Sequence, residues 1–314
     1  AWAMQQIMSG ESTPAQTSAF MIALRAKGES VDEISGLVDV MLENCVPLPT
    51  GSDALDIVGT GGDQAGTVNI SSMASILAAA AGIPVMKHGS RSASGRTGAS
   101  EMLEELGIRL DLPTARVAQI FQEVGLTFFF APVFHPAMRF VAPIRKEIGV
   151  PTTFNFLGPL ANPAQPIATS LGVANANVAP LVAAEMAARG RTALVFRGDD
   201  GLDELTTTAG NKIWQVVGGA VTELELDARD LGLPRVESAA LVGGDAAHNA
   251  SVARALFAGE VSEALQAVAD IVRLNAAGGV VAYELAKDDS RADVSLKLRF
   301  ESALERVTEA LESG

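Results

Sequence analysis

Apolar residues recur at helical spacing through residues 1–50, and no strand-like alternation interrupts them. Two segments have the capping-box pattern that begins helices: Thr13 to Gln16, with proline at the first helical position, and Ser30 to Glu33. The apolar residues that follow Ser30 fall on one side of a helix. The pattern predicts a small all-helical domain over residues 1–50.

From residue 55 onward, short apolar runs alternate with amphipathic segments. Strands are predicted at residues 55–58, 83–86, 127–130, 168–173, 193–196, 213–217 and 221–226, and helices at 72–81, 100–106, 251–257, 262–275 and 293–312. This alternation is typical of an α/β fold with a mainly parallel, helix-covered sheet. We expect residues 51–314 to form one large α/β domain that binds its ligands at the carboxyl ends of the strands.

A helical pattern returns at residues 134–150, between two of the predicted strands. This segment carries Arg139 and Arg145. We expect the region of about 133–150 to join the small helical domain and to bring both arginines over the cleft between the domains.

The charge balance restricts the possible partners. A formal net charge of −14 argues against nucleic acid. The single cysteine, Cys45, excludes internal disulfides and is consistent with the reducing cytosol. No apolar stretch was found that is long enough to cross a bilayer, and the chain does not open on a signal-peptide pattern. We therefore expect a cytoplasmic protein that does not bind membranes.

A glycine-rich loop follows the first predicted strand, at Gly59–Asp63, and leads into a helix start rich in hydroxyl and amide groups. Glycines allow backbone N–H groups to approach a ligand closely, and a helix N-terminus presents unpaired donors. Gln64 stands where a dinucleotide fingerprint needs glycine, and Thr67 stands where a P-loop needs lysine. The loop therefore predicts a phosphate site without a nucleotide motif.

A second segment, residues 85–98, combines Gly and Ser with the cations Lys87, Arg91 and Arg96. It is predicted to leave a strand into a loop, where hydroxyls and cations complete an anion site. His88 lies in the same segment without a second histidine or cysteine nearby, so a hydrogen-bonding or packing role is favoured over metal binding.

A third segment is acidic. Asp203 and Glu204 stand between Leu202 and Leu205, whose side chains should point inward. Adjacent carboxylates at a strand end need a cation, and Mg²⁺ prefers oxygen ligands while it bridges phosphates. Residues 199–200, by contrast, are typical of a solvated acidic turn.

Together these motifs resemble the anthranilate phosphoribosyltransferases of tryptophan biosynthesis, within the nucleoside phosphorylase-like phosphoribosyltransferases. The likeness is collinear over nearly the whole chain and includes residues 7–11, 23–25, 59–63, 69–72, 87–89, 141–149, 154–159, 203–204 and 274–277. It implies transfer of a phosphoribosyl group from 5-phosphoribosyl 1-pyrophosphate (PRPP) to the amine of anthranilate, with release of pyrophosphate. It also implies a homodimer formed through the helical domain.

The resemblance assigns roles residue by residue. Those implied for substrate binding are Gly59, Gly62, Asp63, Thr67, Asn69, Ile70, Ser71, Ser72, Lys87, His88, Gly89, Ser90, Arg91, Ser92, Ala93, Ser94, Gly95, Ala99, Arg145 and Pro159. Arg145, Lys87 and His88 are also implied as catalytic, with Arg145 paired to the anthranilate carboxylate. Ser71 and Glu204 would hold one Mg²⁺, and Asp203 and Glu204 a second.

The chain departs from the family pattern at Ser90, which stands where an asparagine is expected, and at Ser72 and Ala99. Because Ser90 enlarges the acceptor slot, a transferase for a related aminobenzoate is one alternative. A pyrimidine nucleoside phosphorylase shares the architecture and a similar cationic loop, but does not need the Asp-Glu pair. A non-catalytic phosphoribosyl-binding regulator is the alternative from another class, although the acidic pair and Arg145 argue against it.

Overall fold

The computed structural model describes residues 1–48, 50–91 and 97–314. Its helices are α1 (Trp2–Met8), α2 (Pro14–Lys27), α3 (Val31–Glu43), α4 (Ile70–Ala80), α5 (Ala99–Glu105), α6 (Thr114–Val124), α7 (Ala131–Phe134), α8 (Ala142–Ile148), α9 (Leu157–Leu160), α10 (Ala179–Ala188), α11 (Ala246–Phe257), α12 (Glu263–Lys287) and α13 (Leu296–Ser313). Its strands are β1 (Leu55–Gly59), β2 (Val85–Gly89), β3 (Leu126–Phe130), β4 (Ala168–Gly172), β5 (Thr192–Gly198), β6 (Gly210–Val217) and β7 (Ala220–Asp227). Short 3₁₀ turns join some of these elements, among them η1 (Pro136–Phe140).

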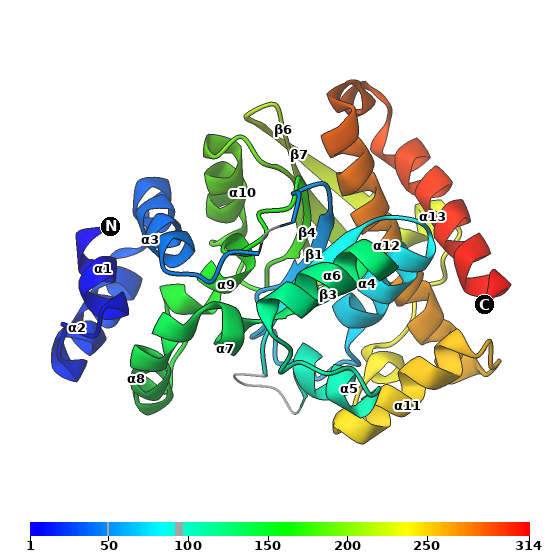
Figure 1. Cartoon of the computed structure of the whole chain (residues 1–314). Helices are drawn as coiled ribbons and strands as arrows, with labels where there is room; N and C mark the ends of the chain where they lie inside the picture. Colours follow the sequence, from blue (N-terminus) through cyan, green and yellow to red (C-terminus); the bar gives the residue numbers. More distant parts are fainter. Residues whose placement is uncertain (49, 92–96) are drawn as a thin grey trace.

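The N-terminal helices form a lobe at the left of Figure 1, beside the sheet. Both predicted capping boxes are confirmed: the Gln16 N–H donates to Thr13 Oγ1 at 3.3 Å, and the Glu33 N–H donates to Ser30 Oγ at 3.3 Å. In each box the side chain at the third helical position accepts from the cap's own N–H in return. α8 packs against α2, and η1 packs against α1.

The sheet of the described residues has seven strands in the order β3-β2-β1-β4-β5-β6-β7. The strands β3, β2, β1, β4 and β5 are parallel to one another. β6 is antiparallel to both of its neighbours, β5 and β7. Gly218 and Gly219, with φ of 57° and 77°, make the tight turn of the β6–β7 hairpin. The prediction of an α/β fold with a mainly parallel sheet and a helical N-terminal region is confirmed.

Alternate residues of each central strand enter different cores, because successive side chains point to opposite faces. Ile57 and Phe196 pack with α4, α12 and α13, whereas Val58 and Val195 pack with α10 and the helical lobe. The sheet is therefore buried on both sides. This explains why its strands have nearly continuous apolar sequences rather than strict alternation.

The predicted helices at 134–150 and 262–275 and the predicted strand at 83–86 were wrong in extent. The helix expected over residues 134–150 is instead α7, η1 and α8, because Pro136 and Pro143 cannot continue a preceding helix. β2 begins at Val85 and continues to Gly89, because Lys87 and His88 pair in register with Phe128 and Phe129 of β3. Both residues therefore lie within a strand rather than in a loop. The helices α6 and α10 were not predicted.

The helix expected to end at residue 275 continues to Lys287 as α12. Gly278 and Gly279 lie in its middle, where a Cβ would approach Leu205 Cδ1 or Ile57 Cδ1 to 2.7 Å. The missing side chains let α12 lie directly against the sheet, and the burial offsets the low helix propensity of glycine.

α12 is also long and apolar enough to span a membrane by length and composition alone, contrary to our expectation for the sequence. However, 83% of its most apolar window is buried inside the fold. It packs against α4, α13 and the strands β4 and β5, so its hydrophobicity is that of a core helix.

Candidate functional site

The sheet reverses its direction of strand addition between β1 and β4, which places a crevice at their carboxyl ends. Gly59 and Gly172 end these strands and face each other in register. A Cβ on Gly59 would lie 2.3 Å from Asp203 Oδ2, and one on Gly172 would lie 1.7 Å from the Asp203 carbonyl oxygen. The two glycines therefore make room for the acidic segment to enter the crevice.

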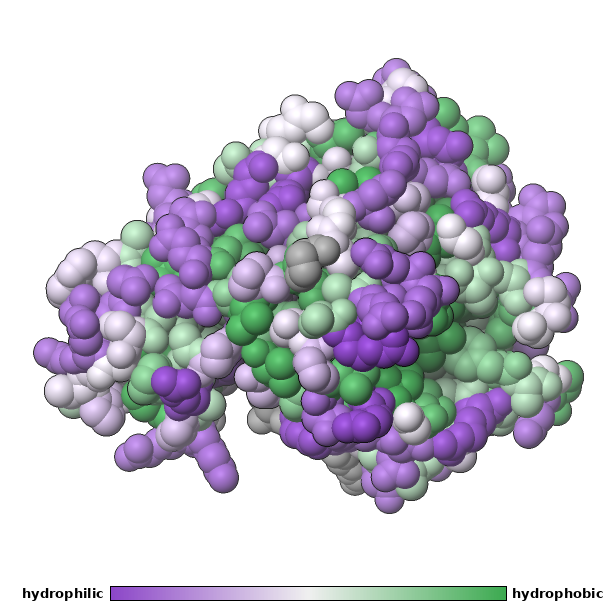
Figure 2. Space-filling model, in the orientation of Figure 1, coloured by the Kyte–Doolittle hydropathy of each residue, from purple (hydrophilic) through white to green (hydrophobic). Residues whose placement is uncertain are grey.

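A cavity of about 990 Å³ opens from this crevice and extends to the helical lobe, where Met41 and Arg145 line it. In Figure 2 the surface is indented between the lobe and the α/β domain. The predicted residues that line the cavity are Gly59, Gly62, Asp63, Thr67, Asn69, Ile70, Ser71, Lys87, His88, Gly89, Ser90, Arg91, Ala99, Arg145, Pro159, Asp203 and Glu204. Ser72 is an exception, because it is buried in α4 away from the lining. The predictions for Ser92, Ala93, Ser94 and Gly95 lie outside the described residues.

The glycine-rich loop takes the left-handed backbone conformation repeatedly. Gly61, Gly62 and Gly66 have φ of 69°, 87° and 64°, and Gln64 adopts φ of 60° without being glycine. Glycine adopts this conformation without strain, so the loop can turn tightly and its backbone can approach a ligand closely.

The acidic pair lies directly against this loop and the start of α4. The Gly61 N–H donates to Asp203 Oδ2 at 2.6 Å, and the Ser71 N–H donates to Glu204 Oε1 at 3.1 Å. Burial and the nearby Asp63 raise the pKa of Asp203 to about 7. Burial and Asp203 raise the pKa of Glu204 well above its ordinary value. Asp199 and Asp200, unlike the acidic pair, are exposed, which agrees with the prediction of a solvated acidic turn.

These groups fit a magnesium ion. Two adjacent buried carboxylates and the Ser71 hydroxyl offer hard oxygen ligands, and a bound cation would offset the burial that raises the pKa values of both carboxyls. Among the described residues, no group of three or more His, Cys, Asp or Glu side chains is arranged to hold a metal without other ligands. A partial oxygen set of this kind suits Mg²⁺, which keeps waters and shares phosphate oxygens.

Metal-free protein should become less stable as the pH rises through the titration of Asp203. Between its ordinary pKa of 3.8 and about 7, folded Asp203 keeps a proton that the unfolded chain releases. The unfolding free energy therefore falls as pH rises through this range. Melting in EDTA at about pH 5 and about pH 8 should show a larger loss of Tm for the wild type than for Asp203→Asn, which cannot titrate. Equal losses would contradict the raised pKa.

Lys87 is the buried cation of the site. Its ammonium donates to the Ile57 carbonyl and, at 3.3 Å, to Ser71 Oγ. Burial lowers its pKa, while Asp56 and the acidic pair oppose that effect. Asp56 in turn accepts from the His88 N–H at 3.1 Å and from Asn162 Nδ2 at 2.8 Å. Charge and hydrogen bonds thus fix Lys87 at the strand end.

His88 is a neutral side chain here. Burial, and then His135, lower its pKa to about 3. Its Nδ1 lies 3.1 Å from the Gly158 carbonyl oxygen, which can only accept, so Nδ1 carries the proton. His88 Nε2 is left as a buried acceptor with no partner among the described residues. The sequence prediction that favoured a hydrogen-bonding role over a metal ligand agrees with this geometry.

The arginines of the cavity differ in how they are compensated. Arg91 pairs with Glu104 at 2.9 Å, and Arg139 lies over the Phe140 ring at 4.6 Å and is exposed. Arg145 is half-buried, and burial lowers its pKa. Among the residues that the structure describes, no carboxylate lies within 4.0 Å of Arg145. Its guanidinium is therefore available to an anionic ligand.

Sequence reasoning missed residues that complete the site from distant segments. Val242, Gly243, Gly244 and Asn249 line the cavity from the start of α11. Asn275 fixes the acidic segment from α12, because its amide accepts from the Leu205 N–H at 2.9 Å and donates to the Leu205 carbonyl at 2.8 Å. A buried asparagine within an apolar helical run was the signal available for Asn275.

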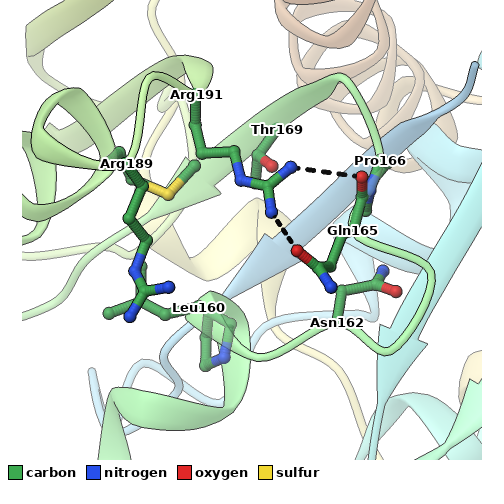
Figure 3. A pocket seen from close by; sticks show the side chains of 9 residues that line it. Leu160, Asn162, Gln165, Pro166, Thr169, Arg189 and Arg191 are labelled. Carbon is green, nitrogen blue, oxygen red and sulfur yellow. Dashed lines mark hydrogen bonds between the residues drawn. The ribbon is translucent and has the colours of Figure 1, made fainter. Parts of the chain in front are cut away.

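A second cavity, lined by Pro159 and two arginines, does not accommodate a substrate (Figure 3). Its volume of about 20 Å³ is that of a single water. Arg191 donates to both the side chain and the carbonyl of Gln165. Arg189 is bound by Glu185 and by Asp39 of α3. These arginines hold the lobe and a loop against α10.

Comparisons with known proteins agree with this geometry. The model described as "Glycosyl transferase family, a/b domain" matches residues 51–314, and "Glycosyl transferase family, helical bundle domain" matches residues 1–45. Anthranilate phosphoribosyltransferase of Leifsonia xyli subsp. xyli is 55% identical over 313 residues, which cover 100% of this chain and 88% of that protein. The enzyme of the same name from a Nocardioides species is 54% identical over 314 residues, 100% of this chain and 89% of that protein.

Solved structures lead to the same result. The crystal structure of anthranilate phosphoribosyltransferase from Thermus thermophilus has a TM-score of 0.87 and 39% identity, and the match covers 99% of this chain and 92% of that one. The Saccharomyces cerevisiae enzyme in complex with PRPP and Mg shares the fold, with a TM-score of 0.80 at 24% identity over 99% of this chain and 91% of that one. The resemblance drawn from the motifs is confirmed. The chain belongs to the anthranilate phosphoribosyltransferase family of glycosyl transferases.

Proposed function

We propose that this chain transfers the phosphoribosyl group of PRPP to the amine of anthranilate and releases pyrophosphate. One observation carries the proposal: a phosphate cradle and an uncompensated guanidinium line the same cavity. Gly62 and Lys87 form the cradle at the strand ends, and Arg145 lines the cavity from α8. A guanidinium fork matches an aromatic carboxylate, so the two ends of the cavity suit the two substrates.

The side chains would act by positioning and by electrostatics. As the bond from ribose C1 to the diphosphate breaks, negative charge grows on the leaving oxygens. The loop N–H groups and Lys87 would stabilise that charge without reorganisation. His88, which is neutral, adds no positive charge beside the ribose ring that becomes cationic. Arg145 would orient the acceptor so that its amine faces C1. No covalent intermediate is required.

We propose that Mg²⁺ is bound by Ser71, Asp203 and Glu204, as two ions per site. The support is the buried pair of adjacent carboxylates beside Ser71 and the S. cerevisiae relative solved in complex with PRPP and Mg. When bound, Mg²⁺ would neutralise the diphosphate and ease its departure.

Replacement of Arg145 tests the acceptor end. Arg145→Ala should raise the KM for anthranilate by about 10²-fold, since it removes a charge-assisted pair in a partly desolvated site. The KM for PRPP should change little, because the cradle lies at the other end of the cavity. Loss of anthranilate fluorescence, followed with and without Mg²⁺ and PRPP, measures both constants.

Arg139→Ala is the matched control. Arg139 lines the same cavity but is exposed and lies over Phe140, so its removal should leave the KM for anthranilate nearly unchanged. If both variants matched the wild type, Arg145 would have no role in binding the acceptor. If the wild type instead cleaved a nucleoside with phosphate and released no pyrophosphate, the phosphorylase alternative would hold.

Several assignments accompany this function as proposals. We propose a homodimer formed through the helical domain, residence in the cytoplasm, and a helical domain of residues 1–50 joined by about 133–150. The packing of α8 on α2 supports the last of these. A related aminobenzoate stays an alternative acceptor, because Ser90 is exposed in the cavity lining.

A further inference from the structure

Residues 241–249, which lead into α11, form a third wall of the phosphate cradle. The Val68 N–H donates to the Leu241 carbonyl at 3.0 Å, and the Gly243 N–H donates to the Gly66 carbonyl at 2.8 Å. The approach is close: a Cβ on Gly243 would lie 2.7 Å from the Thr67 carbonyl oxygen. The wall is therefore built onto the glycine-rich loop by backbone contacts.

Asn249 is the buried polar side chain of this wall. It is 2% exposed and lines the cavity. The Gly244 N–H donates to Asn249 Oδ1 at 2.8 Å, and Asn249 Nδ2 donates to Asn69 Oδ1 at 2.8 Å. A backbone N–H can only donate, so the amide of Asn249 has one permitted orientation. Its Nδ2 must face Asn69.

The orientation of Asn69 follows from that of Asn249. Asn69 precedes α4, where an asparagine usually accepts from an N–H of the first turn, yet it makes no such bond. Its Oδ1 is instead held by Asn249, and its Nδ2 is directed to the Thr97 carbonyl at 3.4 Å. Asn69 and Thr97 both line the cavity. The donor end of Asn69 thus lies away from Asn249, with only one long hydrogen bond.

We infer that Asn249 is a positioning residue that fixes the amide of Asn69 so that its N–H₂ group serves the phosphate oxygens of the sugar donor. The inference rests on the proposed function, which supplies the ligand. Asn249 acts through Asn69, and it need not touch the donor.

Asn249→Asp tests this role with almost no change in shape. The carboxylate still accepts from Gly244, but it cannot donate to Asn69 Oδ1. Asn69 would turn its N–H₂ toward the new carboxylate and present its carbonyl oxygen to the phosphate. The KM for PRPP should rise by about tenfold or more, while the KM for anthranilate stays within about twofold.

Ala247→Asp controls for the added charge. Ala247 is exposed on the same helical turn, so this variant adds a carboxylate without altering Asn69. It should keep the wild-type KM for PRPP. An equal rise in both variants would show a general charge effect and would overturn the inference, as would an unchanged Asn249→Asp.

A second pair of variants applies if Asn249→Asp does not fold. Introduced into the wild type, Asn249→Ala should raise the KM for PRPP. Introduced into an Asn69→Ala variant, the same change should raise that KM by less than about twofold, because Asn69, through which Asn249 acts, is gone. If the KM of the double variant rose by the product of the two single-variant factors, the inference would be overturned. Titration of each variant with inorganic pyrophosphate and Mg²⁺ gives the same comparison through the dissociation constant of pyrophosphate. If the wild type binds pyrophosphate but does not turn over PRPP and anthranilate, the proposed function fails while this comparison still decides the role of Asn249.

Discussion

Glu204→Gln should reduce turnover with saturating PRPP and anthranilate by about 10³-fold and raise the Mg²⁺ concentration needed for half-maximal rate. The amide keeps the size of the side chain and can still accept from the Ser71 N–H, which donates to Glu204 at 3.1 Å. The negative charge is lost, and one carboxylate oxygen is replaced by an amide NH₂, which donates and does not bind Mg²⁺. Because Glu204 is 9% exposed, solvent cannot replace that charge at the metal. Initial rates over a Mg²⁺ titration measure both effects.

Asp199→Asn is the matched control for this prediction. Asp199 belongs to the same acidic segment but is exposed and does not line the cavity. Its loss of charge should leave the Mg²⁺ dependence unchanged. If Glu204→Gln behaved like Asp199→Asn, the acidic pair would not hold the metal, and the charge of Glu204 would serve another purpose.

Gly172→Ala should abolish most activity even though Gly172 carries no functional group. The added Cβ would lie 1.7 Å from the Asp203 carbonyl oxygen and 3.2 Å from the Glu204 nitrogen. These are backbone atoms, so the clash cannot be relieved by a side-chain rotation. The acidic segment must move away from the crevice, and we expect a loss of at least about 10²-fold in kcat together with a destabilisation of about 1–3 kcal/mol.

Gly51→Ala serves as the comparison, because a Cβ there meets nothing within 4 Å. It should retain the Tm and kcat of the wild type. Both quantities are measured for the two variants by thermal melting and initial rates. A Gly172→Ala variant with normal kcat and normal Mg²⁺ dependence would show that the strand ends tolerate displacement of Asp203.

Much of the candidate site could be predicted because its chemistry is concentrated in short segments. The glycine-rich loop, the helix start at Asn69 and the Asp203–Glu204 pair each signal a function locally, and all of them line one cavity. Placing Lys87 in a loop was wrong, because pairing with β3 extends β2 to Gly89 and includes the lysine in the strand. Arg91 lines the cavity but also pairs with Glu104 in an exposed ion pair, so its role as a phosphate-neutralising cation stays a prediction.

The sequence by itself determined the capping boxes, the alternation of strands and helices, the glycine-rich loop and the family, because each depends on residues a few positions apart and on local backbone preferences. Only the tertiary structure showed why Gly172 is glycine, which side chain orients Asn69, and that Arg145 has no carboxylate partner among the described residues. Asn249 and Asn69 are 180 residues apart, and Gly61 and Asp203 are 142 apart. Contacts over such separations depend on strand order and helix packing, and no local pattern encodes them.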